Sequence, residues 1–167
     1  RKSENFERGG DAYRGGGGPP NVADMYEKHE LVDAFIDAGV EIGSKRNTDY
    51  NGAEQEGFGY YQITQRNGRR ESAARAYLNP AKNRANLQIE TDAHVQNLVI
   101  EDKRAVGVEY TVKGRKKEAR CNLEVIISAG AVQSPQILEL SGIGQPDLIR
   151  SNGINVVHEL PGVGENY

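Results

Sequence analysis

Apolar residues in the first third of the chain recur with the period of a helix. They stand at every third or fourth position and predict one buried helical face, at Leu31, Phe35, Ala38 and Ile42. Gly43 follows and is placed to end this helix. The preceding residues 1–24 are polar and rich in glycine, so we expect a loop or connector there.

Aromatic and β-branched residues gather at residues 58–64, after a stretch that is rich in Asn, Asp and Gly. This composition predicts a loop followed by a strand. The pair Asn67-Gly68 then predicts a turn. Ser72 is expected to cap a short helix that Pro80 ends, because proline cannot continue the hydrogen-bond ladder.

From Leu87 onward the period changes to two, which is the period of a half-buried strand. The pattern predicts a three-stranded meander that is open to solvent on one face. Its strands are expected at residues 87–100, 106–112 and 115–121, with turns at Asp102-Lys103 and Lys113-Gly114.

A continuous apolar run, Val125-Ile126-Ile127, suits a strand that is buried on both faces. Small residues follow it, and then Ser134 as the expected N-cap of a helix with Pro135 at its first position. Gly142 is placed to end that helix. A short helix at residues 147–151 and a strand at residues 154–157 complete the predicted elements.

Composition leaves two possibilities open for the chain as a whole. Of its 167 residues 37% are hydrophobic, below the roughly 45–50% of ordinary domains. That deficit fits a piece of a larger protein and a loop-rich domain equally well. Because no Met precedes Arg1 and the last residues show no capping pattern, we expect the polypeptide to continue beyond both ends.

Charge and cysteine content exclude several classes of protein. The net charge is −3 with both signs interspersed, so the sequence shows no basic stripe for nucleic acid. The single cysteine, Cys121, excludes an internal disulfide framework. No apolar run is long enough to cross a bilayer, so we expect no integral membrane segment.

The strand and helix over residues 125–144 carry the strongest functional signal. Small residues at the end of a buried strand let a ligand approach the backbone closely. The following helix offers free N–H groups and the positive end of its dipole near the same point. Ligands of open α/β sheets sit at such carboxyl ends of strands, so an anionic cofactor such as a dinucleotide fits. A plain packing unit fits this local pattern equally well.

Three segments of this chain resemble the glucose–methanol–choline (GMC) oxidoreductase family. Gly130-Ala131-Val132-Gln133-Ser134-Pro135-Gln136-Ile137-Leu138-Glu139-Leu140-Ser141-Gly142-Ile143-Gly144 matches the second signature of that family at every constrained position. Asn67-Gly68-Arg69-Arg70-Glu71-Ser72-Ala73-Ala74-Arg75-Ala76-Tyr77-Leu78 resembles the segment leading into its substrate domain, and Leu160-Pro161-Gly162-Val163-Gly164-Glu165-Asn166 resembles the one after the signature. The resemblance covers nearly the whole chain and is closest to the choline-dehydrogenase-like branch.

The resemblance implies an α+β fold that is part of a two-domain FAD-dependent enzyme. Residues 1–85 would belong to the substrate-binding domain. Residues 86–167 would hold the meander and part of a discontinuous, Rossmann-type FAD domain. The rest of the same polypeptide would supply the Gly-rich phosphate loop and the catalytic histidine, and the chain alone would be inactive.

The function that the resemblance implies is oxidation of a small-molecule alcohol to an aldehyde, with hydride transfer to FAD. A choline-like alcohol is among the candidate substrates. The cofactor contacts implied for this chain are Val95, Ser128, Ala129, Gly130, Ala131 and Asn166. None of the residues here is implied as catalytic, and no metal is implied.

The remaining reactive side chains have ordinary explanations. His29, His94 and His158 show no metal-like spacing with a Cys or carboxylate cluster, and we expect none of them to be the general base. One ring of the Tyr60-Tyr61 pair could face a cationic substrate, although a half-buried strand explains the pair as well. The rival interpretation of the whole chain is a non-catalytic binding module or interaction domain, which would not expose large apolar surfaces.

Overall fold

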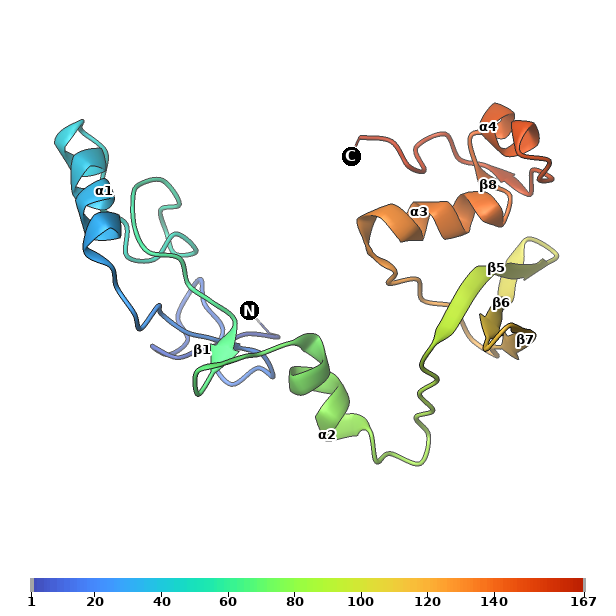
Figure 1. The fold of residues 1–167 in the computed structure, drawn as a ribbon, viewed down its shortest axis with the longest axis horizontal. Coiled ribbons are helices and arrows are strands. Elements are labelled where there is room, and N and C mark those ends of the chain that lie inside the picture. Colours follow the sequence, from blue (N-terminus) through green and yellow to red (C-terminus); the bar gives the residue numbers. More distant parts are fainter. Residues whose placement is uncertain (1, 167) are drawn as a thin grey trace. The chain divides into compact units, whose positions relative to one another are not determined.

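The computed structural model describes residues 2–166 and divides the chain into two compact units, Arg1–Ile89 and Glu90–Tyr167. We call them the N-terminal unit and the C-terminal unit; Figure 1 labels most of their elements. Both contain helices and short strands, so the α+β class predicted from the sequence is confirmed. None of the helices in the described residues has the length and apolar character to cross a membrane.

The N-terminal unit holds one long helix and several short elements. These are β1 (Asn5–Phe6), β2 (Asn21–Val22), α1 (Glu30–Glu41), β3 (Gln65–Arg66), β4 (Arg69–Arg70), a π-helical turn (Ala74–Leu78) and α2 (Asn79–Ala81). The strands pair in twos, β1 with β2 in parallel and β3 with β4 antiparallel. Loops make up most of the rest, as the glycine-rich sequence predicts.

Helix α1 forms where its apolar period predicts it, but it buries a different face. His29 Nδ1 accepts a hydrogen bond from the Leu31 N–H at 3.2 Å and caps the first turn. Ile36 is 2% exposed, whereas Leu31 is 70% and Ile42 81% exposed. The prediction of a buried face through Leu31, Phe35, Ala38 and Ile42 is therefore wrong for this chain.

Gly39 explains why α1 packs on that other face. An added Cβ at Gly39 would lie 2.6 Å from the Phe58 ring, so this ring rests directly on the helix backbone. Phe58 also contacts Phe35, with ring centroids 5.5 Å apart. The loop that carries Phe58 is therefore fixed at the one position of the helix that lacks a side chain.

Residues 58–64 do not form the predicted strand. Phe58 makes a single parallel bridge to Arg46, and Ile63 makes a single antiparallel bridge to Ala23. Because these two partners lie on different loops, the segment has no continuous neighbour with which to build a ladder. Its aromatic residues line a groove instead of a sheet face.

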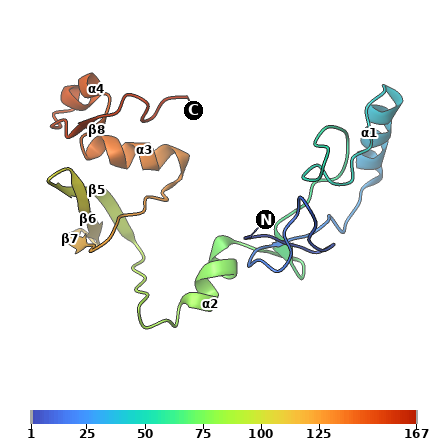
Figure 2. The same ribbon diagram turned by 180° about the vertical axis from the view of Figure 1, so that it is seen from behind.

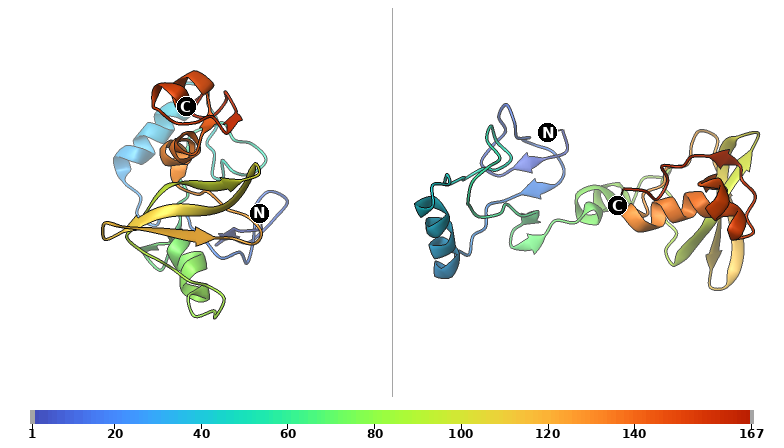
Figure 3. Two further views of the ribbon diagram at one scale, coloured as in Figure 1. Left: turned by 90° about the vertical axis from the view of Figure 1, so that its right-hand side faces the viewer. Right: turned by 90° about the horizontal axis from the view of Figure 1, so that it is seen from above.

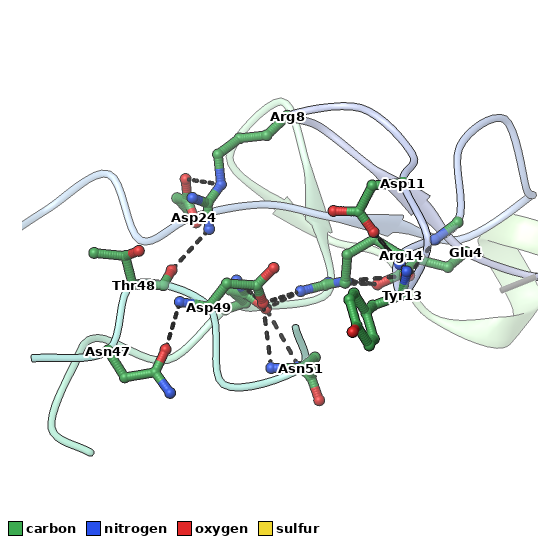
Figure 4. A network of polar contacts seen from close by, with 12 residues as sticks. Glu4, Arg8, Asp11, Tyr13, Arg14, Asp24, Asn47, Thr48, Asp49 and Asn51 are labelled. Atoms are coloured by element: carbon green, nitrogen blue, oxygen red, sulfur yellow. Dashed lines mark hydrogen bonds and ion pairs between the residues drawn. The ribbon is translucent and has the colours of Figure 1, made fainter. Parts of the chain in front are cut away.

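A buried guanidinium holds the loops of the N-terminal unit together. Arg14 is 2% exposed and donates to Glu4 at 2.5 Å and to Asp49 at 2.6 Å, as Figure 4 shows. It also donates to Gln62 at 2.5 Å and lies over the Phe6 ring, 3.7 Å from its centroid. One cation thus links three segments of the chain, around residues 4–14, Asp49 and Gln62.

The acidic partners of Arg14 have lowered pKa values. The hydrogen bond from Arg14 holds the pKa of the Glu4 carboxyl below its usual value, against the opposing effect of burial. Burial alone would raise the pKa of Asp49, but hydrogen bonds from Gln62 and Arg14 outweigh it and lower that pKa. Both groups are therefore held in the charged form that Arg14 requires.

The turn and helix after residue 64 are confirmed with one correction. Asn67 and Gly68 have φ values of +52° and +69°, which suits the two-residue hairpin between β3 and β4. Ser72 Oγ accepts from the Arg75 N–H at 3.3 Å, as predicted. The helix does not end at Pro80, because the π-helical turn leads into α2 and Pro80 falls in its first turn, where its missing N–H is tolerated.

The C-terminal unit begins with the predicted meander. Its strands are β5 (Ala93–Glu101), β6 (Arg104–Val112) and β7 (Arg115–Arg120), in the order β5-β6-β7. Both turns have positive φ values where predicted, at Asp102, Lys103, Lys113 and Gly114. Leu87 and Ile89 lie outside the sheet, so the prediction starts its first strand too early.

Helix α3 (Gly130–Leu140) packs beside β5 and precedes β8 (Ile143–Gly144), α4 (Pro146–Ser151) and β9 (His158–Glu159). Figures 1, 2 and 3 show α3 between the meander and α4. Gly142 has φ +82° and ends α3 as predicted. The predicted strand at residues 154–157 is displaced, since the backbone pairing with β8 is made by β9.

Ser141 joins α3 to the free edge of the sheet. Its buried hydroxyl accepts a hydrogen bond from the Leu98 N–H at 2.8 Å and donates to the Ile137 carbonyl at 2.5 Å. Because β5 is an edge strand, the Leu98 N–H has no strand partner and this hydroxyl takes that place. The helix is therefore set against the sheet by a polar contact as well as by packing.

Residues 122–129 connect the meander to α3 as an extended chain without strand pairing. The prediction of a buried strand at Val125-Ile126-Ile127 is not met in this chain, and Ile126 is 76% exposed. A strand needs a hydrogen-bonded neighbour, and none of the described strands lies beside this segment. Leu123, which is 85% exposed, also lies outside every strand of the described residues.

We predict that Gly39→Ala destabilises the N-terminal unit. In an open helix this change would add about 0.5–1 kcal/mol of stability. Here the new methyl would meet the Phe58 ring, and overpacking of this kind costs about 1–3 kcal/mol. Urea denaturation of the purified protein measures the difference. The cost should shrink when Phe58→Leu is introduced as well, and additive costs would show that the ring does not rest on Gly39.

We predict that Ser141→Ala costs about 1–3 kcal/mol, because it leaves the Leu98 N–H buried without a partner. Ser151→Ala is the matched control, since the Ser151 hydroxyl is exposed, donates to the Leu148 carbonyl and accepts only a long contact of 3.5 Å from the Asn152 side chain. It should change stability by less than about 0.5 kcal/mol. Equal effects of the two substitutions on the free energy of unfolding would contradict the proposed bridge.

We predict that the N-terminal unit loses stability on acidification. The pKa values of Glu4 and Asp49 are lowered in the folded chain, so their contribution is complete above their unfolded values of about 4. It is lost as the pH falls through the lower folded values. Arg14→Gln should reduce this pH dependence. Identical slopes of stability against pH for both proteins would rule out the network as its source.

Candidate functional site

The first turn of α3 is the centre of the candidate site. The helix begins at Gly130, four residues before the predicted start at Ser134. The expected N-cap role of Ser134 is therefore wrong, since Ala129 is the N-cap and Pro135 lies inside the helix. Gly130 has φ +89°, which turns the extended chain into the helix and explains the earlier start.

Ser134 lies in the second turn of α3, and its side chain still contacts the backbone at the start of the helix. Its hydroxyl accepts a hydrogen bond from the Ala129 N–H at 3.2 Å. Ala129 itself offers no side-chain acceptor to the N–H groups of the first turn. These N–H groups are therefore presented at the end of α3 by small residues, with the positive end of the helix dipole behind them.

A groove runs between α3 and the C-terminal segment of the chain. Its lining on the helix includes Ala131, Ser134, Pro135 and Glu139, and its opposite side is formed by residues 163–166. We call it the α3 groove. Val163 is 8% exposed and anchors the segment. The Gln145 side chain also donates to Glu165 at 2.9 Å.

Gly164 allows the segment to lie close to the helix. It has φ +78°, and an added Cβ would be 3.3 Å from Glu139 Oε1 and 3.9 Å from Pro135 Cβ. Sequence reasoning did not assign a role to Pro135, Glu139 or Gly164 in this groove. The spacing of four between Ala131, Pro135 and Glu139 is the signal that places them on one face.

The structure brings together part of the predicted cofactor contacts. Ala131 and Asn166 line the same α3 groove although they are distant in the sequence. Ser128, Ala129 and Gly130 lead directly into the start of α3. Val95 lies half-buried on β5 opposite Tyr110, and the contacts described for residues 2–166 do not join it to the groove.

None of the three histidines lines this groove. His29 caps α1, while His94 is exposed on β5 opposite Thr111 and His158 is exposed on β9. Within the described residues, no three His, Cys, Asp or Glu side chains are grouped so that they could hold a metal ion. The polar groups of the α3 groove are therefore backbone N–H groups, the Ser134 hydroxyl, the Asn166 amide and the carboxylates of Glu139 and Glu165.

These features are compatible with a dinucleotide ligand. The exposed helix end can receive an anionic or polar group, and the small residues let a flat or extended ligand approach the backbone. An added Cβ at Gly130 would meet no atom within 4 Å, so the start of α3 is open at this residue. The carboxylates of Glu139 and Glu165 provide hydrogen-bond acceptors in the α3 groove.

Comparison with known proteins identifies the family to which the chain belongs. The "GMC oxidoreductase" family model matches residues 14–167. The chain is 49% identical to "Oxygen-dependent choline dehydrogenase 1" of Chromohalobacter salexigens over 99% of its own length and 30% of that protein. It thus spans about 30% of the length of the curated relatives that it matches.

Two solved structures share the fold. Pyridoxine 4-oxidase from Mesorbium loti is 32% identical with a TM-score of 0.87, over 96% of this chain and 32% of that one. An FAD-dependent oxidoreductase from Chaetomium thermophilum is 28% identical with a TM-score of 0.87, over 99% of this chain and 31% of that one. With the signature on α3 and a match over most of its length, the chain belongs to the GMC oxidoreductase family.

Proposed function

We propose that this chain is part of an FAD-dependent oxidoreductase that converts an alcohol into an aldehyde. Alcohols of the choline type are the favoured substrates, because a relative with 49% identity over nearly the whole chain is a choline dehydrogenase. The α3 groove carries the proposal, since it combines the family signature with an open helix start. When bound, FAD supplies the acceptor for the hydride that leaves the alcohol carbon.

The chain's own part in this function is to bind and orient the cofactor. We assign cofactor contacts to the backbone of Ser128, Ala129 and Gly130, to Ala131, and to the Asn166 side chain. Their common property is a small or amide group at the open end of α3. Val95 is proposed as a further contact on the basis of the family resemblance alone.

Exposed apolar side chains support an enzyme of larger size over a self-sufficient binding module. Leu123 and Ile126 are 85% and 76% exposed on an unpaired extended segment, and Val132 on α3 is 65% exposed. A module that functions alone would bury such residues. We propose that residues 122–129 pair with a parallel sheet formed by the rest of the polypeptide.

The two units are assigned to the two domains of such an enzyme. We propose that residues 1–85 contribute to the substrate-binding domain and residues 86–167 to the FAD domain. The general base and the phosphate-binding loop would come from the remainder of the polypeptide. His29, His94 and His158 would then tolerate substitution by alanine with turnover within about tenfold of the parent, whereas loss of a general base costs about 10²–10⁴.

We predict that Ala131→Phe lowers the flavin content of the full-length protein at least tenfold, because the ring would fill the α3 groove. Ala119→Phe is the control, since Ala119 is exposed on β7 in the same unit and lies outside the groove. Visible absorbance of the purified proteins measures bound flavin. Full flavin content in both variants would refute the assignment of this groove to the cofactor.

Substrate oxidation is tested directly on the flavin-loaded full-length protein. Choline added without oxygen should bleach the visible flavin absorbance, and the aldehyde should appear in equal amount. A protein that purifies without flavin, and does not gain it on reconstitution, would support the rival interpretation of a non-catalytic module. If the protein binds flavin but choline does not reduce it, choline is ruled out as the substrate, and the proposed oxidation of an alcohol by FAD still stands.

A further inference from the structure

Residues 164–166, which line the α3 groove opposite the helix, have an unusual backbone conformation. Gly164 has φ +78° and Asn166 has φ +57°. The left-handed region favours glycine, and asparagine is among the few other residues that enter it readily. Two such residues within three positions turn the chain twice. The direction of the Asn166 side chain therefore depends on how Glu165, the residue between them, is held.

Gln145 holds Glu165 by a side-chain hydrogen bond. The Gln145 amide donates to Glu165 Oε1 at 2.9 Å, across 20 residues of sequence. The Glu165 N–H also donates to the Gly162 carbonyl, at 3.4 Å, which is long for a hydrogen bond. Among the hydrogen bonds described for residues 2–166, the contact from Gln145 is the only short one that reaches residues 164–166.

Gln145 is itself fixed at a junction of regular elements. It is the N-cap of α4, and its carbonyl accepts from the Ile149 N–H at 3.0 Å. The preceding residue, Gly144, belongs to β8, and its carbonyl accepts from the Leu160 N–H at 3.0 Å. The position of β8 and α4 is thus passed through one side chain to a segment that has little backbone hydrogen bonding of its own.

The direction of Asn166 matters because the two ends of its amide differ. The oxygen accepts hydrogen bonds and the nitrogen donates them, so a cofactor atom is held only when the matching end faces it. Ala131, which lines the same groove, has a methyl group that cannot orient the amide by a hydrogen bond. The orientation of Asn166 is therefore set from its own side of the groove.

We propose that Gln145 is a positioning residue for the cofactor contact at Asn166. The inference rests on the proposed function, which assigns the Asn166 side chain to the cofactor. Gln145 does not line the groove and acts through Glu165. Loss of its donor should loosen residues 164–166 and weaken flavin binding, while the fold persists because such a contact adds little to global stability.

Titration of the full-length apoprotein with FAD, followed by the quenching of flavin fluorescence, measures the dissociation constant. Gln145→Met has a similar length and no donor, and it should raise this constant about two- to tenfold, as expected for one lost hydrogen bond. Its melting temperature should stay within about 2 °C of that of the parent protein.

Asn152→Leu is the matched control on the same helix. The Asn152 amide donates to the Leu148 carbonyl at 2.9 Å, makes one further contact at 3.5 Å to Ser151, and does not line the groove. This variant loses a hydrogen bond of the same length, so it should bind FAD within twofold of the parent protein. Equal weakening by Gln145→Met and Asn152→Leu would overturn the proposal.

The Asn166→Ala background separates positioning from a general effect on the unit. Asn166→Ala should itself weaken FAD binding, and Gln145→Met should then add no further loss, because it acts through the missing amide. A further loss of the same size would overturn the proposal. Weaker binding in Asn166→Ala together with unchanged binding in Gln145→Met would overturn the positioning role alone. Unchanged binding in Asn166→Ala would refute the proposed cofactor contact and this inference with it.

Discussion

The hydroxyl of Ser141 accepts a hydrogen bond from the free edge of β5 and donates one to the last turn of α3. Gly142 then reverses the chain, and an added Cβ there would collide with the Asn155 carbonyl at 2.3 Å. These two adjacent residues fix the C-terminal end of α3 against the sheet. The other end of the helix is thereby held beside residues 163–166, where the proposed cofactor contacts lie.

A different constraint organises the N-terminal unit, which has few strands to order its loops. The buried side chain of Arg14 joins Glu4, Asp49 and Gln62 through charge-assisted hydrogen bonds. Phe58 rests on Gly39 and fixes the loop against α1. As a result, the loops of this unit are held in place without an extended sheet.

Periodicity predicted the elements whose partners are close in the sequence. The meander, its two positive-φ turns and the Asn67-Gly68 hairpin all follow from local rules. The helical period also located α1, but the face it buries depends on Gly39, whose missing side chain no apolar pattern reports. Period alone therefore could not identify the buried face.

The wrong predictions share one physical cause. Each element depends on other parts of the chain that its own local sequence does not reveal. The run Val125-Ile126-Ile127 has strand composition, yet a strand exists only where a neighbour pairs with it. Ser134 has the composition of an N-cap, but the positive φ of Gly130 starts the helix earlier. For the site, the family signature identified helix α3 from the sequence. That Gly164 and Glu165 lie against this helix could be seen only in the structure.

The central claim is that the open start of α3 and the facing segment contact FAD. Hydrogen–deuterium exchange of the full-length protein, with and without FAD, tests it most directly. The account predicts that the cofactor slows exchange of the amides at residues 128–134 and at residues 164–166, while β6 and β7 exchange at the same rate in both states. Equal exchange at residues 128–134 with and without bound flavin would contradict the account.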